Sequence, residues 1–230
     1  MNMKRLIMTM FVIAIGAGLY AQNNFFPSKA GIVLTYADND AGGNVQGYSV
    51  LTIKDVKGSG RNMTIAYGLK ALDKNRKPLN NMPGEMNYQV VIKDNVAVMD
   101  INRMIPAQSR EKGVKAEVTG TPIELPNNLQ PGQSLKASEA TITIDLGVMK
   151  VITVVKTEGK CLAVEDVKVP AGTFKCHKIT QKVTSTAMNT TIVETIVSWY
   201  APNIGTVKSE TYDDKNKLIS SSVLVELKGN

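Results

Sequence analysis

His177 is the only histidine in the 230-residue chain, so any Ser-His-Asp or Cys-His arrangement must use it. It follows Cys176 in the segment FKCHKI, which reads as a β-strand. Neighbouring strand residues point to opposite faces of a sheet, so these two side chains cannot easily pair as base and nucleophile. The chain also lacks the G-x-S-x-G nucleophile motif. We therefore expect His177 to be an ordinary surface residue of a strand and predict no catalytic residue.

Paired carboxylates would support glycosidase chemistry, and Glu165 with Glu194 is one such pair. The spacing does not single it out, because any β-rich protein of this size contains similar pairs. One histidine and two cysteines lack the spacing of known metal sites, and no glycine-rich loop precedes a helix to cradle phosphate. The sequence thus predicts a protein that is not an enzyme, with no metal site and no cofactor.

Cys161 and Cys176 are separated by a turn signal, Pro170-Ala171-Gly172, that fits a three-residue hairpin loop. In that register Cys176 lies opposite Asp166, and Cys161 lies five residues further along, or about 16 Å away. A disulfide requires Cα atoms within about 7 Å. A tight hairpin therefore excludes the bridge, and a bridge would exclude the tight hairpin. An oxidising compartment would permit the bridge, but we favour the hairpin with free or buried thiols.

Short alternating runs rich in Val, Ile, Thr and Tyr dominate the chain, separated by Gly, Asn, Asp and Pro. Their spacing is typical of an antiparallel meander rather than of βαβ units. Asp94-Asn95 indicates a tight hairpin, and Asp213 to Asn216 a further turn. The predicted strands are Gly31–Tyr36, Tyr48–Val56, Met63–Leu72, Met86–Lys93, Val96–Ile101, Lys115–Thr119, Ala140–Leu146, Met149–Thr157, Leu162–Val169, Phe174–Val183, Thr191–Trp199, Gly205–Tyr212 and Leu218–Leu227.

We predict an all-β, mainly antiparallel fold: a curved sheet or partly open β-barrel with at most one or two short helices. Only Ile101–Glu111 has a helical pattern, which Pro106 interrupts. The segment Thr121–Ser134 contains several prolines and reads as a long connection, where a sub-domain boundary would fall. We favour a single β-rich domain over residues 22–230, crossed by that loop.

The first 21 residues have the layout of a secretory signal peptide. Lys4 and Arg5 precede an uncharged apolar run, and Ala21-Gln22 is a plausible cleavage point, although Leu19 two places earlier is not small. The run of about 15 residues is short for a membrane anchor, which remains the alternative. There is no Cys near the cleavage point for lipid attachment, and no later segment approaches a transmembrane run. We expect a soluble mature protein, exported to the periplasm or cell envelope.

The formal net charge of +7 falls to +5 when Lys4 and Arg5 are removed with the signal peptide. A basic surface attracts anionic partners. However, the charges are scattered, and the densest stretch, Lys70 to Lys77, holds four basic residues and one Asp with no aromatic ladder beside it. Nucleic acid is therefore not expected as a partner.

The C-terminal half carries VPAGTFKCHKI at Val169–Ile179 and WYAPNIGTVKSE at Trp199–Glu210, followed by YDDKNKLISSSVLVEL. Together with LPNNLQPGQSL at Leu125–Leu135, these segments resemble the TapB-like family of exported, mostly uncharacterised bacterial proteins. The resemblance covers roughly residues 125 to 228. It implies a curved antiparallel sheet and neither an enzyme activity nor a known ligand. The chain departs from the family at His177, where Tyr is more usual, and this also weighs against a catalytic histidine.

Two functions of different classes follow. The first is a non-catalytic binding or carrier module that holds an apolar or lipid-like ligand, or a peptide, in a groove lined by several strands. The second is a structural protein with a filled core that docks another envelope protein through an exposed edge or patch. The sequence leans to the first, because its many Met, Val and Ile residues need two faces to occupy. A hydrolase is a distant third.

Trp199, the only tryptophan, is expected to cap the core with its N–H bonded to a partner.

Overall fold

The computed structural model describes residues 24–79, 84–99, 115–145 and 150–229, and these ranges contain strands and turns but no helix. None of the described residues forms a helix long and apolar enough to cross a bilayer. The predicted signal peptide and the helical pattern of Ile101–Glu111 lie outside the described residues. The prediction of an all-β chain is confirmed for the part of the chain that the structure describes.

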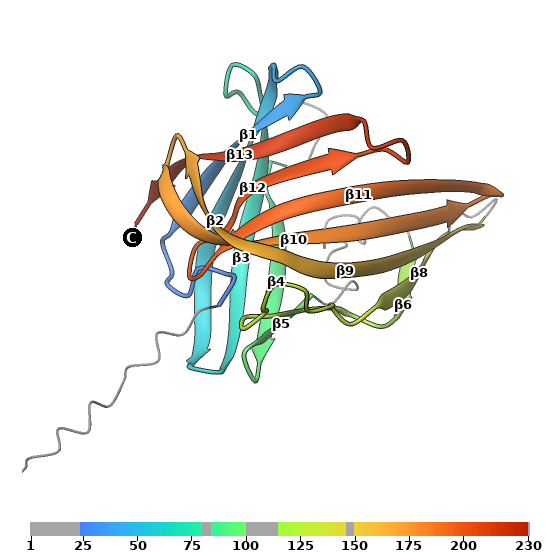
Figure 1. The fold of residues 1–230 in the computed structure, drawn as a ribbon, viewed down its shortest axis with the longest axis horizontal. Helices are drawn as coiled ribbons and strands as arrows, with labels where there is room; N and C mark the ends of the chain where they lie inside the picture. The colour runs from blue at the N-terminus through green and yellow to red at the C-terminus, as the bar shows by residue number, and fades with distance from the viewer. Residues whose placement is uncertain (1–23, 80–83, 100–114, 146–149, 230) are drawn as a thin grey trace, which may run out of the picture.

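In the described ranges, thirteen strands form one antiparallel sheet (Figure 1). Most of them coincide with the alternating runs in the sequence, because alternation gives a strand one apolar and one polar face. The strands are β1 (Val33–Asp40), β2 (Val45–Ser59), β3 (Asn62–Asp73), β4 (Met86–Lys93), β5 (Val96–Met99), β6 (Lys115–Gly120), β7 (Ile123–Pro126), β8 (Ser138–Asp145), β9 (Lys150–Val169), β10 (Gly172–Ala187), β11 (Thr190–Ala201), β12 (Gly205–Tyr212) and β13 (Leu218–Lys228).

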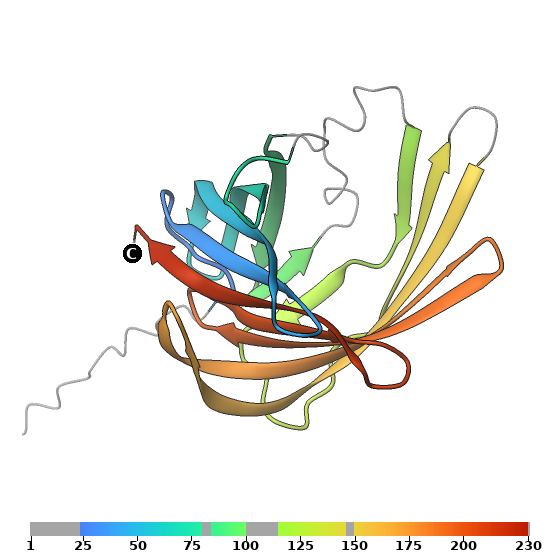
Figure 2. The same cartoon turned by 90° about the horizontal axis from the view of Figure 1, so that it is seen from above.

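The spatial order is β6-β8-β9-β10-β11-β12-β13-β1-β2-β3-β4-β5-β7, so the last and first long strands of the chain pair at the centre. The two edge strands, β6 and β7, are consecutive in the chain and joined only by Thr121 and Pro122. Two linking residues span at most about 11 Å between the flanking Cα atoms, so the edges must approach each other. No ladder joins them, and the sheet stays open and strongly curved (Figure 2). The predicted curved sheet is confirmed, and it is not closed into a barrel.

One face of this sheet, here called the core face, carries most of the large buried side chains. Following the ladder partners from strand to strand places Ile179 of β10 on the same face as Leu34, Ile65 and Val90 of β1, β3 and β4. All four are at most 1% exposed. The curl turns these strands toward one another, so a single cluster joins the N- and C-terminal halves. The opposite side is here called the outer face.

The segment before β1 closes part of the core face. Phe25 is 1% exposed, and its ring contacts His177 and Tyr200 at centroid distances of 5.0 and 5.6 Å. The Asn203 backbone N–H donates to the Asn24 carbonyl at 2.6 Å. The first described residues are therefore part of the fold rather than a free tail.

Three local predictions differ from the structure. The runs predicted as Met149–Thr157 and Leu162–Val169 are one strand, β9, because Gly159 allows close approach to β10: a Cβ there would lie 2.6 Å from the Thr180 carbonyl oxygen. The predicted loop Thr121–Ser134 contains edge strand β7, which pairs with β5 despite Pro122 just before it and Pro126 at its end. Val169 pairs with Gly172, so the hairpin loop has two residues, Pro170 and Ala171, rather than three.

The turn predictions are confirmed where the structure describes them. Asp94 and Asn95 have φ of 50° and 66° and link Lys93 to Val96 in a two-residue hairpin. Asp213 accepts the Lys215 and Lys217 backbone N–H groups at 2.9 and 2.8 Å through one carboxylate oxygen.

Candidate functional site

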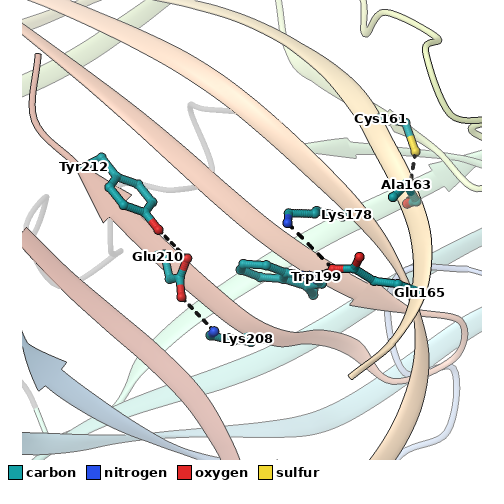
Figure 3. Close-up of polar contacts among 8 residues, drawn as sticks. All are labelled: Cys161, Ala163, Glu165, Lys178, Trp199, Lys208, Glu210 and Tyr212. Atoms are coloured by element: carbon teal, nitrogen blue, oxygen red, sulfur yellow. Dashed lines mark hydrogen bonds and ion pairs between the residues drawn. The ribbon is translucent and has the colours of Figure 1, made fainter. Parts of the chain in front are cut away.

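Trp199 lies on the outer face between two lysines (Figure 3). It pairs across the ladders with Lys178 of β10 and Lys208 of β12, and their ammonium groups lie 5.0 and 4.7 Å from its ring centroid. Its indole N–H donates to Glu165 Oε1 at 2.7 Å, and Glu165 also lies 3.7 Å from the Lys178 ammonium. The predicted bond of this N–H to a partner is confirmed. The indole is 6% exposed and belongs to the buried core cluster, although its ladder position is on the outer face.

A second carboxylate completes this group. Glu210 accepts a hydrogen bond from the Tyr212 hydroxyl at 2.5 Å and lies 2.7 Å from the Lys208 ammonium. Burial alone would raise the pKa of Glu210, but the Lys208 and Tyr212 hydrogen bonds outweigh it and lower that pKa. The same hydrogen bond, with burial, raises the pKa of Tyr212 to about 12. Glu210 is thus held in its ionised form by donors of its own strand, and Glu165 is paired with donors from β10 and β11, which ties these strands to β9.

His177 lies on the core face and is not an ordinary surface residue, so that prediction is wrong. Its Nδ1 lies 3.0 Å from the Leu129 carbonyl oxygen, and its ring meets the Phe25 ring edge to face. Because a carbonyl only accepts, Nδ1 carries the proton. Burial lowers the pKa of His177, and the nearby charge of Lys175 adds to this, against the opposing effect of the Leu129 hydrogen bond. A neutral histidine here fastens the N-terminal segment and the loop after β7 to the sheet.

Cys176 and His177 do face opposite sides of β10, which confirms the argument against a nucleophile and base pair. Both cysteines are buried and free. Cys176 lies opposite Glu165 and Cys161 opposite Ile179, so the two cysteines are four positions apart along β9, or about 13 Å. The prediction of free, buried thiols is therefore confirmed, although its register was one residue off.

The structure does not bring Glu165 and Glu194 together. Glu165 lies opposite Cys176 and Glu194 opposite Val183, seven positions apart along β10 and on opposite faces, or about 23 Å. Glycosidase carboxylates lie within about 10 Å of each other. Within the described ranges, no three His, Cys, Asp or Glu side chains group as metal ligands.

The far half of the core face, on β8 to β11, is apolar but incompletely covered. We call the seven Ile and Val side chains on this half, named at the end of this paragraph, the aliphatic strip. The ladders place its members side by side on the core face, and all but Ile192 are half-buried, whereas Ile192 is 56% exposed. Thr153, Ser185 and Glu194 interrupt it on the same face. The strip consists of Ile142, Ile144, Val151, Val155, Val183, Ile192 and Ile196.

A cavity of about 480 Å³ lies against the middle of β9, β10 and β11. By register, the strand side chains that line it belong to the outer face: Glu158, Lys160, Thr180, Lys182 and Thr195. Sequence reasoning missed this grouping, since Lys160 and Lys182 are distant in the chain and meet only through the hairpin register. The aliphatic strip and the outer-face cavity are therefore two separate candidate sites, on opposite faces of the same strands.

The fold and these sites define a class: an open, curved antiparallel sheet with a partly exposed apolar core face. The chain belongs to the DUF3108-like family, whose model matches residues 29–224. No curated protein matches it.

Two crystal structures have the same fold. A proposed exported protein of YmcC-like fold from Bacteroides fragilis has a TM-score of 0.68 and 23% identity, covering 90% of this chain and 100% of that one. A proposed lipoprotein from Parabacteroides distasonis has a TM-score of 0.69 and 21% identity, covering 90% of this chain and 99% of that one. At these identities the likeness concerns the fold.

Proposed function

We propose that this protein is an exported, non-catalytic carrier of the cell envelope that binds a lipid-like ligand on the aliphatic strip. Export is supported by the signal-like N-terminus and by the descriptions of the two related structures. Within the DUF3108-like family, we further propose that the chain groups with the TapB-like proteins, on the motifs at Val169–Ile179 and Trp199–Glu210.

The aliphatic strip is the observation that carries the proposal. Its four strands cover about 14 Å across the sheet, and Val151 to Val155 cover about 13 Å along β9. The curl of the sheet makes this face the concave one. Aliphatic side chains line it, while Ser185 and Glu194 supply polar groups beside them. This mixture suits an acyl chain with a polar end.

The near half of the core face is filled, which confines the proposed ligand to the far half. Phe25 and Leu129 are at most 1% exposed where they cover His177 and its neighbours. The packing there is that of a protein interior, so among the described residues of this face the aliphatic strip is the apolar surface available to a guest.

The test is native mass spectrometry of the mature protein purified from its own envelope, together with titration of the delipidated protein with a fluorescent long-chain fatty acid. We expect a co-purifying lipid-like mass and saturable binding with one site per chain. A stoichiometric protein partner with no fatty-acid binding would replace the carrier by the docking function. Binding of neither kind would contradict both.

A further inference from the structure

Two lysines of the outer-face cavity differ from their neighbours because neither forms an ion pair with a described carboxylate. Lys156 lies 3.3 Å from Glu139, and the lysines beside Trp199 are paired with Glu165 and Glu210. For Lys160 and Lys182, none of the described carboxylates lies within ion-pair distance, and both side chains are exposed. The cavity is thus lined by two lysines on adjacent strands that outnumber the Glu158 carboxylate beside them.

The register holds these lysines close to each other and to hydroxyl groups. Lys160 lies opposite Thr180, and Lys182 lies opposite Glu158 on one side and Thr195 on the other. Lys160 and Lys182 are therefore diagonal neighbours, about 7 to 8 Å apart at the backbone. Lysine stems are long and flexible, so both ammonium groups can reach one anionic group between them, within reach of the two threonine hydroxyls.

The far wall of the cavity is fixed by backbone hydrogen bonds. The Leu135 N–H donates to the Gly159 carbonyl at 2.8 Å, and the Cys161 N–H donates to the Gln133 carbonyl at 2.9 Å. These bonds hold Ser134, Leu135 and Ala137 against β9, where they line the cavity. The wall adds a third hydroxyl and a small apolar surface to the two lysines.

We propose that the outer-face cavity binds a phosphate-type oxyanion carried by a small molecule or a lipid headgroup. Two ammonium groups and three hydroxyls can all donate hydrogen bonds to an oxyanion, and charge-assisted hydrogen bonds are the strong ones. A volume of about 480 Å³ exceeds that of the anion alone and lies within the range of small-molecule sites, so an attached organic group fits beside it. The site lies on the opposite face from the aliphatic strip, and the proposal does not rest on the carrier function.

The experiment is an NMR titration of the ¹⁵N-labelled mature protein with inorganic phosphate and with glycerol 3-phosphate, followed at the Thr180 and Thr195 amides. We expect saturable shifts, tighter binding of the organic phosphate, and weaker binding as salt increases. The double variant Lys160→Gln/Lys182→Gln should weaken binding at least about tenfold, while Lys160→Arg/Lys182→Arg retains it.

Two further variants separate a specific site from general charge. Lys168→Gln/Lys175→Gln removes the same charge from exposed positions of β9 and β10 that do not line the cavity, and should leave binding unchanged. Among the described residues that line the cavity, Glu158 is the one carboxylate, and Glu158→Gln should tighten binding a few-fold. Equal losses in both lysine pairs, or shifts that do not saturate, would overturn the proposal.

A second arm identifies the source of the oxyanion. Vesicles of phosphatidylcholine with phosphatidic acid are compared with pure phosphatidylcholine vesicles in flotation. Retention that depends on phosphatidic acid and on Lys160 and Lys182 assigns a lipid headgroup. Saturable binding of glycerol 3-phosphate without flotation assigns a soluble phosphate compound. The site is refuted when neither form binds.

Discussion

The Trp199 indole N–H and the Glu165 carboxylate form a 2.7 Å hydrogen bond between residues 34 positions apart, and this bond ties β9 to β11 across β10. The indole is 6% exposed, so the N–H has little access to water as an alternative acceptor. Removing Glu165 therefore leaves a donor desolvated and unpaired.

We predict that Glu165→Ala lowers the free energy of unfolding by about 1 to 3 kcal/mol, the cost of an unsatisfied buried donor. Glu165→Gln keeps an acceptor oxygen and should retain most of the free energy that Glu165→Ala loses. Asp166→Ala, at an exposed neighbouring position, should change stability by less than about 0.5 kcal/mol. Urea denaturation followed by tryptophan fluorescence measures all three. Similar losses for Glu165→Ala and Asp166→Ala would show that the hydrogen bond contributes little.

The buried thiols give a second prediction. Burial, together with the nearby Asp166 and Glu165 carboxylates, raises the pKa of Cys176 to about 12, and burial also raises that of Cys161. A thiol reagent at pH 8 should modify neither cysteine in the native protein and both after denaturation. Fewer than two reactive thiols in the denatured, unreduced protein would contradict the free state.

The same shift predicts loss of stability at alkaline pH. The unfolded thiol ionises near pH 8.5, whereas the folded one stays protonated until about pH 12. Below pH 8.5 the thiol is protonated in both states, so the contribution of Cys176 to the free energy of unfolding is complete. It then declines with rising pH, by at most about 1.4 kcal/mol per unit for one group. Cys176→Ala should flatten the slope of unfolding free energy between pH 9 and 11. An unchanged slope would assign the alkaline loss to the buried tyrosines instead.

The strands and the antiparallel sheet could be predicted from alternation alone, because side-chain period is a local property. Edge strand β7 could not, since Pro122 and Pro126 are also turn signals and only pairing with β5 makes the segment a strand. The hairpin after Val169 was misplaced by one residue, because both loop lengths suit Pro170-Ala171-Gly172. That shift changed the partner of Cys176 from Asp166 to Glu165.

The candidate sites were harder to foresee because they depend on contacts between distant segments. The position of His177 depends on Phe25 and Leu129, which both precede it by more than 45 residues in the chain. The outer-face cavity depends on the β9–β10 register, which brings Lys160 and Lys182 together across a 22-residue separation. Local pattern determines which face a strand residue takes, but not which charges meet on that face.

The single histidine allows a direct pH test. Its Hε1 proton gives one resonance, and we predict that it titrates below the ordinary value of about 6.5, because burial disfavours the charged form. As the pH falls, the unfolded state therefore binds its proton at a higher pH than the folded state does. The contribution of His177 to the free energy of unfolding is complete above about pH 6.5 and declines below it. Between pH 7 and 5, the His177→Phe variant should therefore lose less free energy of unfolding than the unchanged protein does. A titration midpoint at or above 6.5 would show that the Leu129 hydrogen bond outweighs burial.

Two isoleucines of similar exposure test the carrier function by face. Ile192 is 56% exposed on the core face, within the aliphatic strip, and Ile152 is 53% exposed on the outer face. We predict that Ile192→Glu weakens binding of a fluorescent long-chain fatty acid about tenfold or more, since it places a charge against the acyl chain. Ile152→Glu adds the same charge at matched exposure and should leave binding unchanged.

Neither position is buried, so both variants should fold, and circular dichroism checks this. Equal loss in the two variants would indicate an effect of net charge, and loss confined to Ile152→Glu would place the ligand on the outer face and overturn the assignment of the strip.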